Sequence, residues 1–140
     1  MASIPRYADT QFEPLVTDDD VLDRAGELLG RATIRQFWLM FLDAEQRQLP
    51  TLIPASVPHH PDPDDVAWLE QFVGQVTAGL EASSVVVTFE RPGSEDLTPD
   101  DCRWLRALRD ACLGASLNLR GPLLCHDEGV RWVAADEFAY

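Results

Sequence analysis

Residues 84–116 read SVVVTFERPGSEDLTPDDCRWLRALRDACLGAS, and this stretch decides the fold. It opens with β-branched and aromatic residues over 85–89, a run of the length that a buried strand needs. Residues 91–94, RPGS, have the composition of a turn. Apolar side chains then recur at helical spacing up to Gly114, where we expect the helix to end. The stretch therefore predicts a strand, a turn crowded with acidic residues and a long helix.

The start of this helix is marked by the residues Thr-Pro-Asp-Asp at 98–101. The Thr98 hydroxyl can accept a hydrogen bond from a free amide of the first turn, and the Asp101 carboxylate can bind the amide of Thr98 in return. Proline suits the first helical position because its missing donor is not needed there. The cap residue and the aspartate three positions later recur at 17–20 and 62–65, in the second case again with a proline between them. We therefore interpret Thr98 and Asp101 as a capping pair at an exposed helix end, with a catalytic role as the alternative.

The remaining patterns predict an extended N-terminal arm over residues 1–16, whose Tyr7, Phe12 and Leu15 are expected to pack on the body, and one α/β domain over residues 17–140. The predicted elements of the domain are helix, strand, strand, helix, strand, helix, strand and strand, at 17–30, 34–42, 49–57, 62–80, 85–89, 98–114, 117–124 and 130–134. Prolines within 49–57 remove ladder donors and place that strand at a sheet edge. Gly121-Pro122 interrupts the penultimate strand. This order predicts a mixed central sheet flanked by about three helices.

Composition excludes several classes of function. The 24 acidic residues outnumber the 11 basic residues, and the resulting net charge of −13 repels phosphate backbones, so we expect no nucleic-acid partner. The longest apolar run, 37–42, is too short to span a bilayer, and the N-terminal residues lack an apolar signal region. Three cysteines, Cys102, Cys112 and Cys125, show no CxxC spacing. We expect a soluble, cytoplasmic protein with no membrane partner.

The strand, turn and helix of residues 84–116 resemble the JAB/MPN metalloprotease-like domain, in particular its bacterial RadC-like branch. In that family the strand ends in His-x-His-Pro, the next helix opens with Ser-x-x-Asp, and the two histidines and the aspartate hold zinc. The matching positions in this chain are Phe89, Arg91, Pro92, Thr98 and Asp101.

Two further stretches extend this resemblance. Residues 42–47 are similar to the LLDxxNR-like stretch of the family, and parts of 112–126 are similar to its LLGIxLLDH stretch. The order of predicted elements over 18–134 also matches. The resemblance implies a JAB/MPN-like, that is cytidine deaminase-like, architecture.

The same resemblance implies a zinc site that has lost its ligands. Phenylalanine has no lone pair to donate and a guanidinium stays protonated, so Asp101 is left alone where a catalytic zinc needs three protein ligands. The position of the family's general-base glutamate falls at Leu52 or a close neighbour. We expect Arg91 to pair with Asp101 or Glu90 where zinc sits in the family. The resemblance thus implies a non-catalytic domain, a pseudoenzyme without a cofactor, that binds a protein or a small molecule.

Two other functions compete with this reading. His59 and His60 stand together and Asp62 follows, so the alternative is a metal-dependent hydrolase built on these residues and nearby aspartates. Against it, adjacent histidines point in different directions on a regular backbone, and Asp62 begins a helix-start pattern. A third possibility is a homo-oligomeric or regulatory interface, for which the proline-rich strand at 49–57 and the aromatic tail at 136–140 offer surface.

Overall fold

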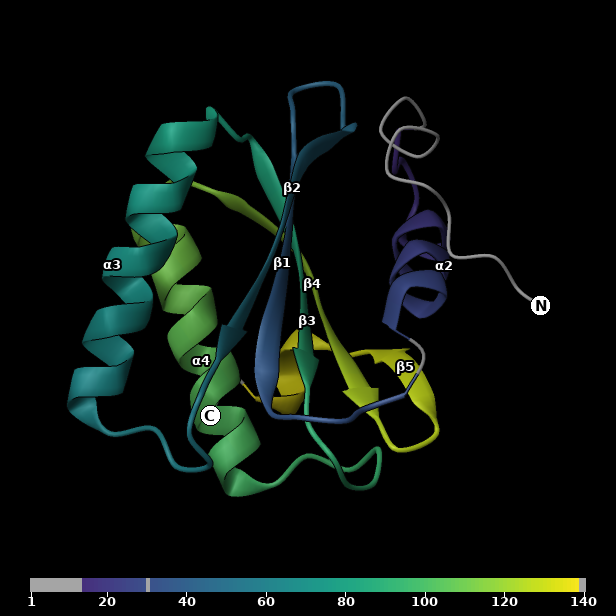
Figure 1. Ribbon diagram of the computed structural model, residues 1–140, viewed down its shortest axis with the longest axis vertical. Coiled ribbons are helices and arrows are strands. Elements are labelled where there is room, and N and C mark those ends of the chain that lie inside the picture. The colour runs from purple at the N-terminus through teal and green to yellow at the C-terminus, as the bar shows by residue number, and fades with distance from the viewer. Residues whose placement is uncertain (1–13, 30, 139–140) are drawn as a thin grey trace.

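The structure is a computed structural model that describes residues 14–29 and 31–138. Residues 1–13 of the predicted arm, which include Tyr7 and Phe12, lie outside these ranges. The described residues form a mixed sheet with helices on both faces (Figure 1). In chain order the elements are α2 (Asp18–Leu29), β1 (Gln36–Leu42), β2 (Gln48–Ser56), α3 (Pro63–Leu80), β3 (Ser84–Glu90), α4 (Pro99–Gly114), β4 (Asn118–His126), β5 (Gly129–Trp132) and the short 3₁₀ helix η1 (Ala135–Glu137). This is the order that the sequence predicts.

The sheet has the strand order β2-β1-β3-β4-β5. β1 is antiparallel to both of its neighbours, β3 and β4 are parallel, and β5 returns antiparallel beside β4. The parallel pair is joined by α4, because two adjacent parallel strands need a long crossover. Residues 84–116 thus supply a strand of the sheet centre and the crossover helix.

Helices cover the two faces unequally. α3 and α4 lie together on one face, and α2 lies on the other (Figure 1). Side chains of β1 alternate between the two layers: Phe37, Leu39 and Phe41 face α3 and α4, whereas Met40 and Leu42 join the cluster under α2. A strand buried on both faces reads as a continuous apolar run, which confirms the central position predicted for this segment.

Trp104 anchors α4 to the sheet. Its side chain is fully buried, and its ring meets Phe37 edge-on at a centroid distance of 5.9 Å. Phe37 in turn lies 4.8 Å from Phe89. The Trp104 indole Nε1 donates a hydrogen bond of 3.1 Å to the carbonyl oxygen of Pro58. Trp104 therefore connects α4 to the beginning of β1 and to the segment that leads into α3.

All three predicted capping boxes are confirmed. In each, the cap side chain accepts from the amide three residues on, and that residue's carboxylate accepts from the cap amide; the pairs are Thr17/Asp20, Asp62/Asp65 and Thr98/Asp101. One expectation about them is wrong. Asp101 was expected at an exposed helix end, but its side chain is fully buried because two arginines pack against it.

β2, β4 and the C-terminal tail differ in how well they follow the sequence. β2 is an edge strand, as its prolines predict. β4 is not broken at Gly121-Pro122; it continues to His126 with an irregularity in its register opposite residues 86–88. Gly121 has a φ of 122°, and a Cβ there would lie 3.2 Å from the Val87 carbonyl oxygen, so glycine lets the strand pass. In the predicted aromatic tail, Phe138 is buried and does not offer the exposed surface expected there, and Tyr140 lies outside the described residues.

The end of the N-terminal arm is attached to the sheet. Leu15 is buried in the cluster under α2, as expected, and its amide donates to the Gln46 carbonyl oxygen at 2.8 Å. Arg120 of β4 donates to the carbonyl oxygens of residues 15–17. Within residues 14–29 and 31–138, no helix is long and apolar enough to cross a membrane.

Candidate functional site

The fold brings together Arg91 and Asp101, two of the positions at which the resemblance implies a lost zinc site. β3 ends at Glu90, and α4 begins at Pro99, so the turn between them carries Arg91 next to Asp101. Phe89 points into the layer of α3 and α4, where its ring contacts Phe37. Of the two partners predicted for Arg91, the structure selects Asp101.

Arg91 and Asp101 form a buried ion pair. Their residues are 2% and 0% exposed, and Arg91 Nε donates to Asp101 Oδ2 at 3.0 Å. The other guanidinium nitrogens donate to carbonyl oxygens of the turn, Nη1 to Ser94 and Nη2 to Asp96 at 2.8 Å. A guanidinium suits this position because its planar fork presents several donors in fixed directions. Arg91 thus ties the turn to the first residues of α4.

Asp101 has further partners. Its Oδ2 accepts from the Thr98 amide at 2.9 Å, and its Oδ1 lies 3.5 Å from Arg35 Nη1. Arg35 also stacks over the Phe89 ring at 5.8 Å from the centroid. Both carboxylate oxygens are therefore engaged by cations and an amide. Together with an apolar ring at 89 and a cation at 91, this donor set does not fit zinc, which needs deprotonated nitrogen, sulfur or oxygen ligands.

Glu90 was considered in the sequence only as a partner of Arg91, and its actual contacts were missed. It is buried at the end of β3, and its Oε2 accepts from the Thr33 amide at 2.7 Å, the Thr33 hydroxyl at 3.0 Å and the Ile34 amide at 3.2 Å. Its Oε1 accepts from Gln36 Nε2 and Trp38 Nε1, both at 2.8 Å. A glutamate at the end of an otherwise apolar strand was the available signal, since a buried carboxylate needs partners.

The environment of Glu90 sets its charge. Burial by itself raises the pKa of this carboxyl, but the hydrogen bonds from Thr33, Gln36, Trp38 and Ile34 outweigh burial and lower the pKa from 4.5 to about 2. The group is ionised at neutral pH and saturated with donors. A carboxylate with so low a pKa is a poor general base, so Glu90 fastens the segment before β1 to β3.

The histidines of the alternative hypothesis meet a different aspartate from the one expected. His60 Nδ1 lies 2.7 Å from Asp100 Oδ1, and His59 Nδ1 lies 3.3 Å from Asp100 Oδ2. Arg103 Nη1 binds the same carboxylate at 2.8 Å. The hydrogen bond with His60 is the main influence that lowers the pKa of Asp100, against the smaller opposing effect of burial.

Asp62, the third residue of that hypothesis, does not join them. It caps α3 through Asp65. Across the part of the chain that the structure describes, no three histidine, cysteine, aspartate or glutamate side chains are gathered so that they could hold a metal ion. The ligand set His59, His60 and Asp62 is therefore not assembled.

The other candidate groups have structural surroundings. Leu52, at or near the position of the family's general base, is a half-buried side chain of the cluster under α2. Cys112 lies in the core, as predicted, and burial raises the pKa of its thiol to about 12. Burial, helped by the Glu90 charge, raises the pKa of Cys125 to about 11. Neither thiol supplies a thiolate nucleophile at neutral pH.

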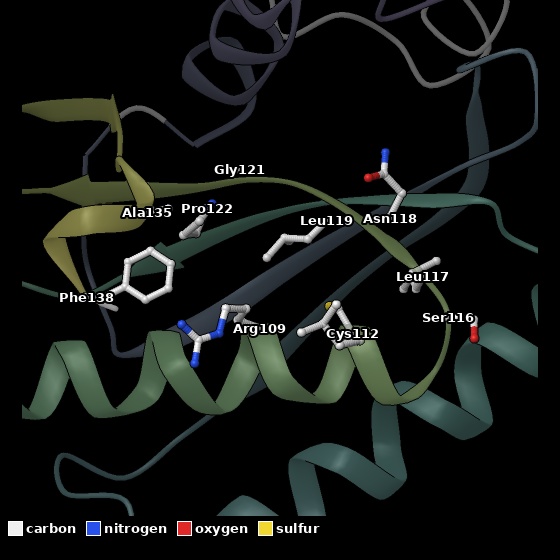
Figure 2. Close-up of a pocket in the computed structure, with 11 residues that line it drawn as sticks. Arg109, Cys112, Ser116, Leu117, Asn118, Leu119, Gly121, Pro122, Ala135 and Phe138 are labelled. Atoms are coloured by element: carbon white, nitrogen blue, oxygen red, sulfur yellow. The ribbon is translucent and has the colours of Figure 1, made fainter. Parts of the chain in front are cut away.

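A groove lies away from the Arg91–Asp101 pair, between the C-terminal half of α4 and β4 (Figure 2). It has a volume of about 500 Å³. The lining residues are Arg109, Cys112, Leu113, Ser116, Leu117, Asn118, Leu119, Gly121, Pro122, Ala135 and Phe138. Nothing in the sequence indicated it, because its walls come together only when η1 folds back over α4.

Comparison with known proteins gives no relative. No protein-family model matches the chain, and no curated protein matches it. What the chain does is therefore inferred from its own residues.

Proposed function

We propose that this chain is a non-catalytic JAB/MPN-like domain with a ligand-binding, protein-binding or regulatory role. In this proposal an arginine has replaced the metal of the family. The observation that carries it is the buried Arg91–Asp101 pair at the junction of β3 and α4. The order of elements, Pro92 after the strand and the Thr98-x-x-Asp101 helix start also agree with the pattern of that family.

An arginine can replace a metal ion in its structural role at this junction. A zinc ion neutralises its carboxylate ligand and draws separate segments together, and Arg91 supplies one positive charge to Asp101 while it binds two carbonyl oxygens of the turn. Removing one member of a buried ion pair leaves an uncompensated charge and typically costs 3–5 kcal/mol. We infer that the conformation of the turn depends on this pair.

The chemistry of the junction supports a non-catalytic role. A hydrolase of this kind needs a metal-bound or base-activated water. Asp101 is engaged by two arginines and an amide, and Glu90 is engaged by five donors. Among the described residues of the junction, neither carboxylate is left to activate a water.

The experiment is a metal analysis of the chain purified without chelator. We expect less than a tenth of a zinc ion per chain, and no rise in melting temperature on addition of zinc, since a ligand that binds only the folded state must raise it. Asp101→Asn and the pair His59→Ala/His60→Ala separate the two conceivable sites. About one zinc per chain, lost in Asp101→Asn, would overturn the proposal; loss in the histidine variant would instead favour the hydrolase hypothesis.

A further inference from the structure

We propose that the groove between α4 and β4 binds a small amphipathic carboxylate, an aliphatic chain with a carboxylate at one end. The carboxylate lies at Arg109 and the chain runs along β4. This inference names a site and a class of ligand for the binding role proposed above, and it rests on that function only in treating the chain as a binding domain.

The walls of the groove suit an apolar chain. Its volume of about 500 Å³ lies in the range of small-molecule sites. Leu117 just before β4, Leu119 and Pro122 of β4, and Phe138 after β5 contribute apolar surface (Figure 2). Leu113 of α4 stands at the rim with 70% of its surface exposed, which makes it one of the most exposed large apolar residues described.

The charge in the groove lies at one end. Among the described residues that line it, Arg109 alone is charged. Its guanidinium lies beside Phe138, 5.9 Å from the ring centroid, at the opposite end from Ser116 (Figure 2). From Arg109 to the end of α4 at Gly114 the helix rises by about 7.5 Å along its axis, and the groove continues past that end to Ser116 and Leu117. The groove thus offers a cation followed by an apolar track that fits a chain of medium length.

Arg109 is able to accept a ligand carboxylate. Its Nε and Nη2 contact Asp110 Oδ1 at 3.2 Å, from the next position on the same helix. Both side chains are more than a third exposed, and an exposed pair of this kind contributes little to stability. A guanidinium has five donors, so a second carboxylate can be bound beside or in place of Asp110.

The net charge of −13 does not decide the sign of the ligand. Charges on an exposed surface are screened over about 8 Å at physiological ionic strength. The charge that a bound molecule meets is therefore that of the groove itself. If the overall charge decided, a cationic amphiphile would bind more tightly; if Arg109 decides, an anionic one binds more tightly. Comparing the two affinities tests the assignment.

The experiment titrates the full chain with decanoate, decylamine and acetate, below the concentrations at which the amphiphiles aggregate. Calorimetry gives the affinity, and amide NMR shifts give the location. We expect one saturable decanoate site whose shifts centre on residues 117–121. Decylamine should bind at least tenfold more weakly, and acetate should show no saturable binding because it lacks the chain.

Variants assign the site. Arg109→Gln should weaken decanoate binding by about ten- to a hundredfold, the range for a charge-assisted hydrogen bond. Arg103→Gln is the matched control, because Arg103 is an exposed arginine of the same helix outside the groove, and it should change the affinity less than twofold. Leu113→Glu, at an exposed position that cannot disturb the core, should weaken binding at least fivefold.

Three results would each overturn the assignment: no saturable decanoate binding, equal or tighter binding of decylamine, or equal losses in Arg109→Gln and Arg103→Gln. These outcomes are distinct from failure of the proposed function. Stoichiometric zinc at Asp101 would refute the non-catalytic assignment without changing decanoate binding, and absent decanoate binding leaves the metal analysis unaffected.

Discussion

Replacing Glu90 by glutamine should remove a large part of the acid sensitivity of this protein. The folded-state pKa of Glu90 is about 2, against 4.5 for an unperturbed glutamate. Because the folded state lowers the pKa, the contribution to stability is complete above pH 4.5 and is lost as the pH falls towards 2. The difference of about 2.5 pH units corresponds to about 3 kcal/mol of unfolding free energy.

The assay is urea unfolding from pH 6 to pH 2.5, with midpoints compared at equal slopes. At pH 6 we expect Glu90→Gln to be about 3 kcal/mol less stable than wild type. The glutamine NH₂ would face groups such as the Thr33 amide and Gln36 Nε2, which now donate hydrogen bonds to the carboxylate oxygens of Glu90. The gap should close as the pH approaches 2.5. Glu70→Gln, at an exposed position of α3, is the control and should follow wild type. Parallel pH profiles for wild type and Glu90→Gln would refute the reasoning.

Two further predictions concern local structure. Thr98→Ala should lower the free energy of unfolding by about 0.5–2 kcal/mol through the lost cap hydrogen bond. Asp101→Asn should lower it by more, about 3–5 kcal/mol, because it leaves Arg91 buried without its carboxylate partner. Urea midpoints in the reverse order would contradict the described geometry. Gly121→Ala should lower the melting temperature, because Gly121 has a positive φ and lies close to the Val87 carbonyl oxygen. Gly74→Ala, at a position of α3 with no neighbouring atom in the way, should instead stabilise the fold by about 0.5–1 kcal/mol. Similar shifts in melting temperature for both variants would refute the role of Gly121.

Local patterns predicted the elements well, because they depend on neighbours in the chain. The threonine and aspartate caps located three helix starts, and the apolar run at 37–42 located a strand buried on both faces. Prolines located the edge strand β2. Each of these signals acts within a few residues, so the sequence carries it directly.

The site was predicted only in part, because its contacts join distant segments. The pairing of Arg91 with Asp101 spans ten residues and was anticipated. The donors to Glu90 come from residues 33–38, more than fifty positions away, and the partner of His59 and His60 is forty positions away on α4. No local period reports such contacts. Asp101 was therefore expected at an exposed helix end, and the structure buries it.

The measurement that tests the central claim most directly is a double-mutant cycle on Arg91 and Asp101, with and without zinc. Unfolding free energies are compared for wild type, Arg91→Met, Asp101→Asn and the double variant. We predict that each single variant loses about 3–5 kcal/mol, that the double variant loses clearly less than the sum, and that zinc changes none of the four values. Additive losses, together with stabilisation of wild type by zinc, would contradict the claim that Arg91 holds this turn in place of a metal.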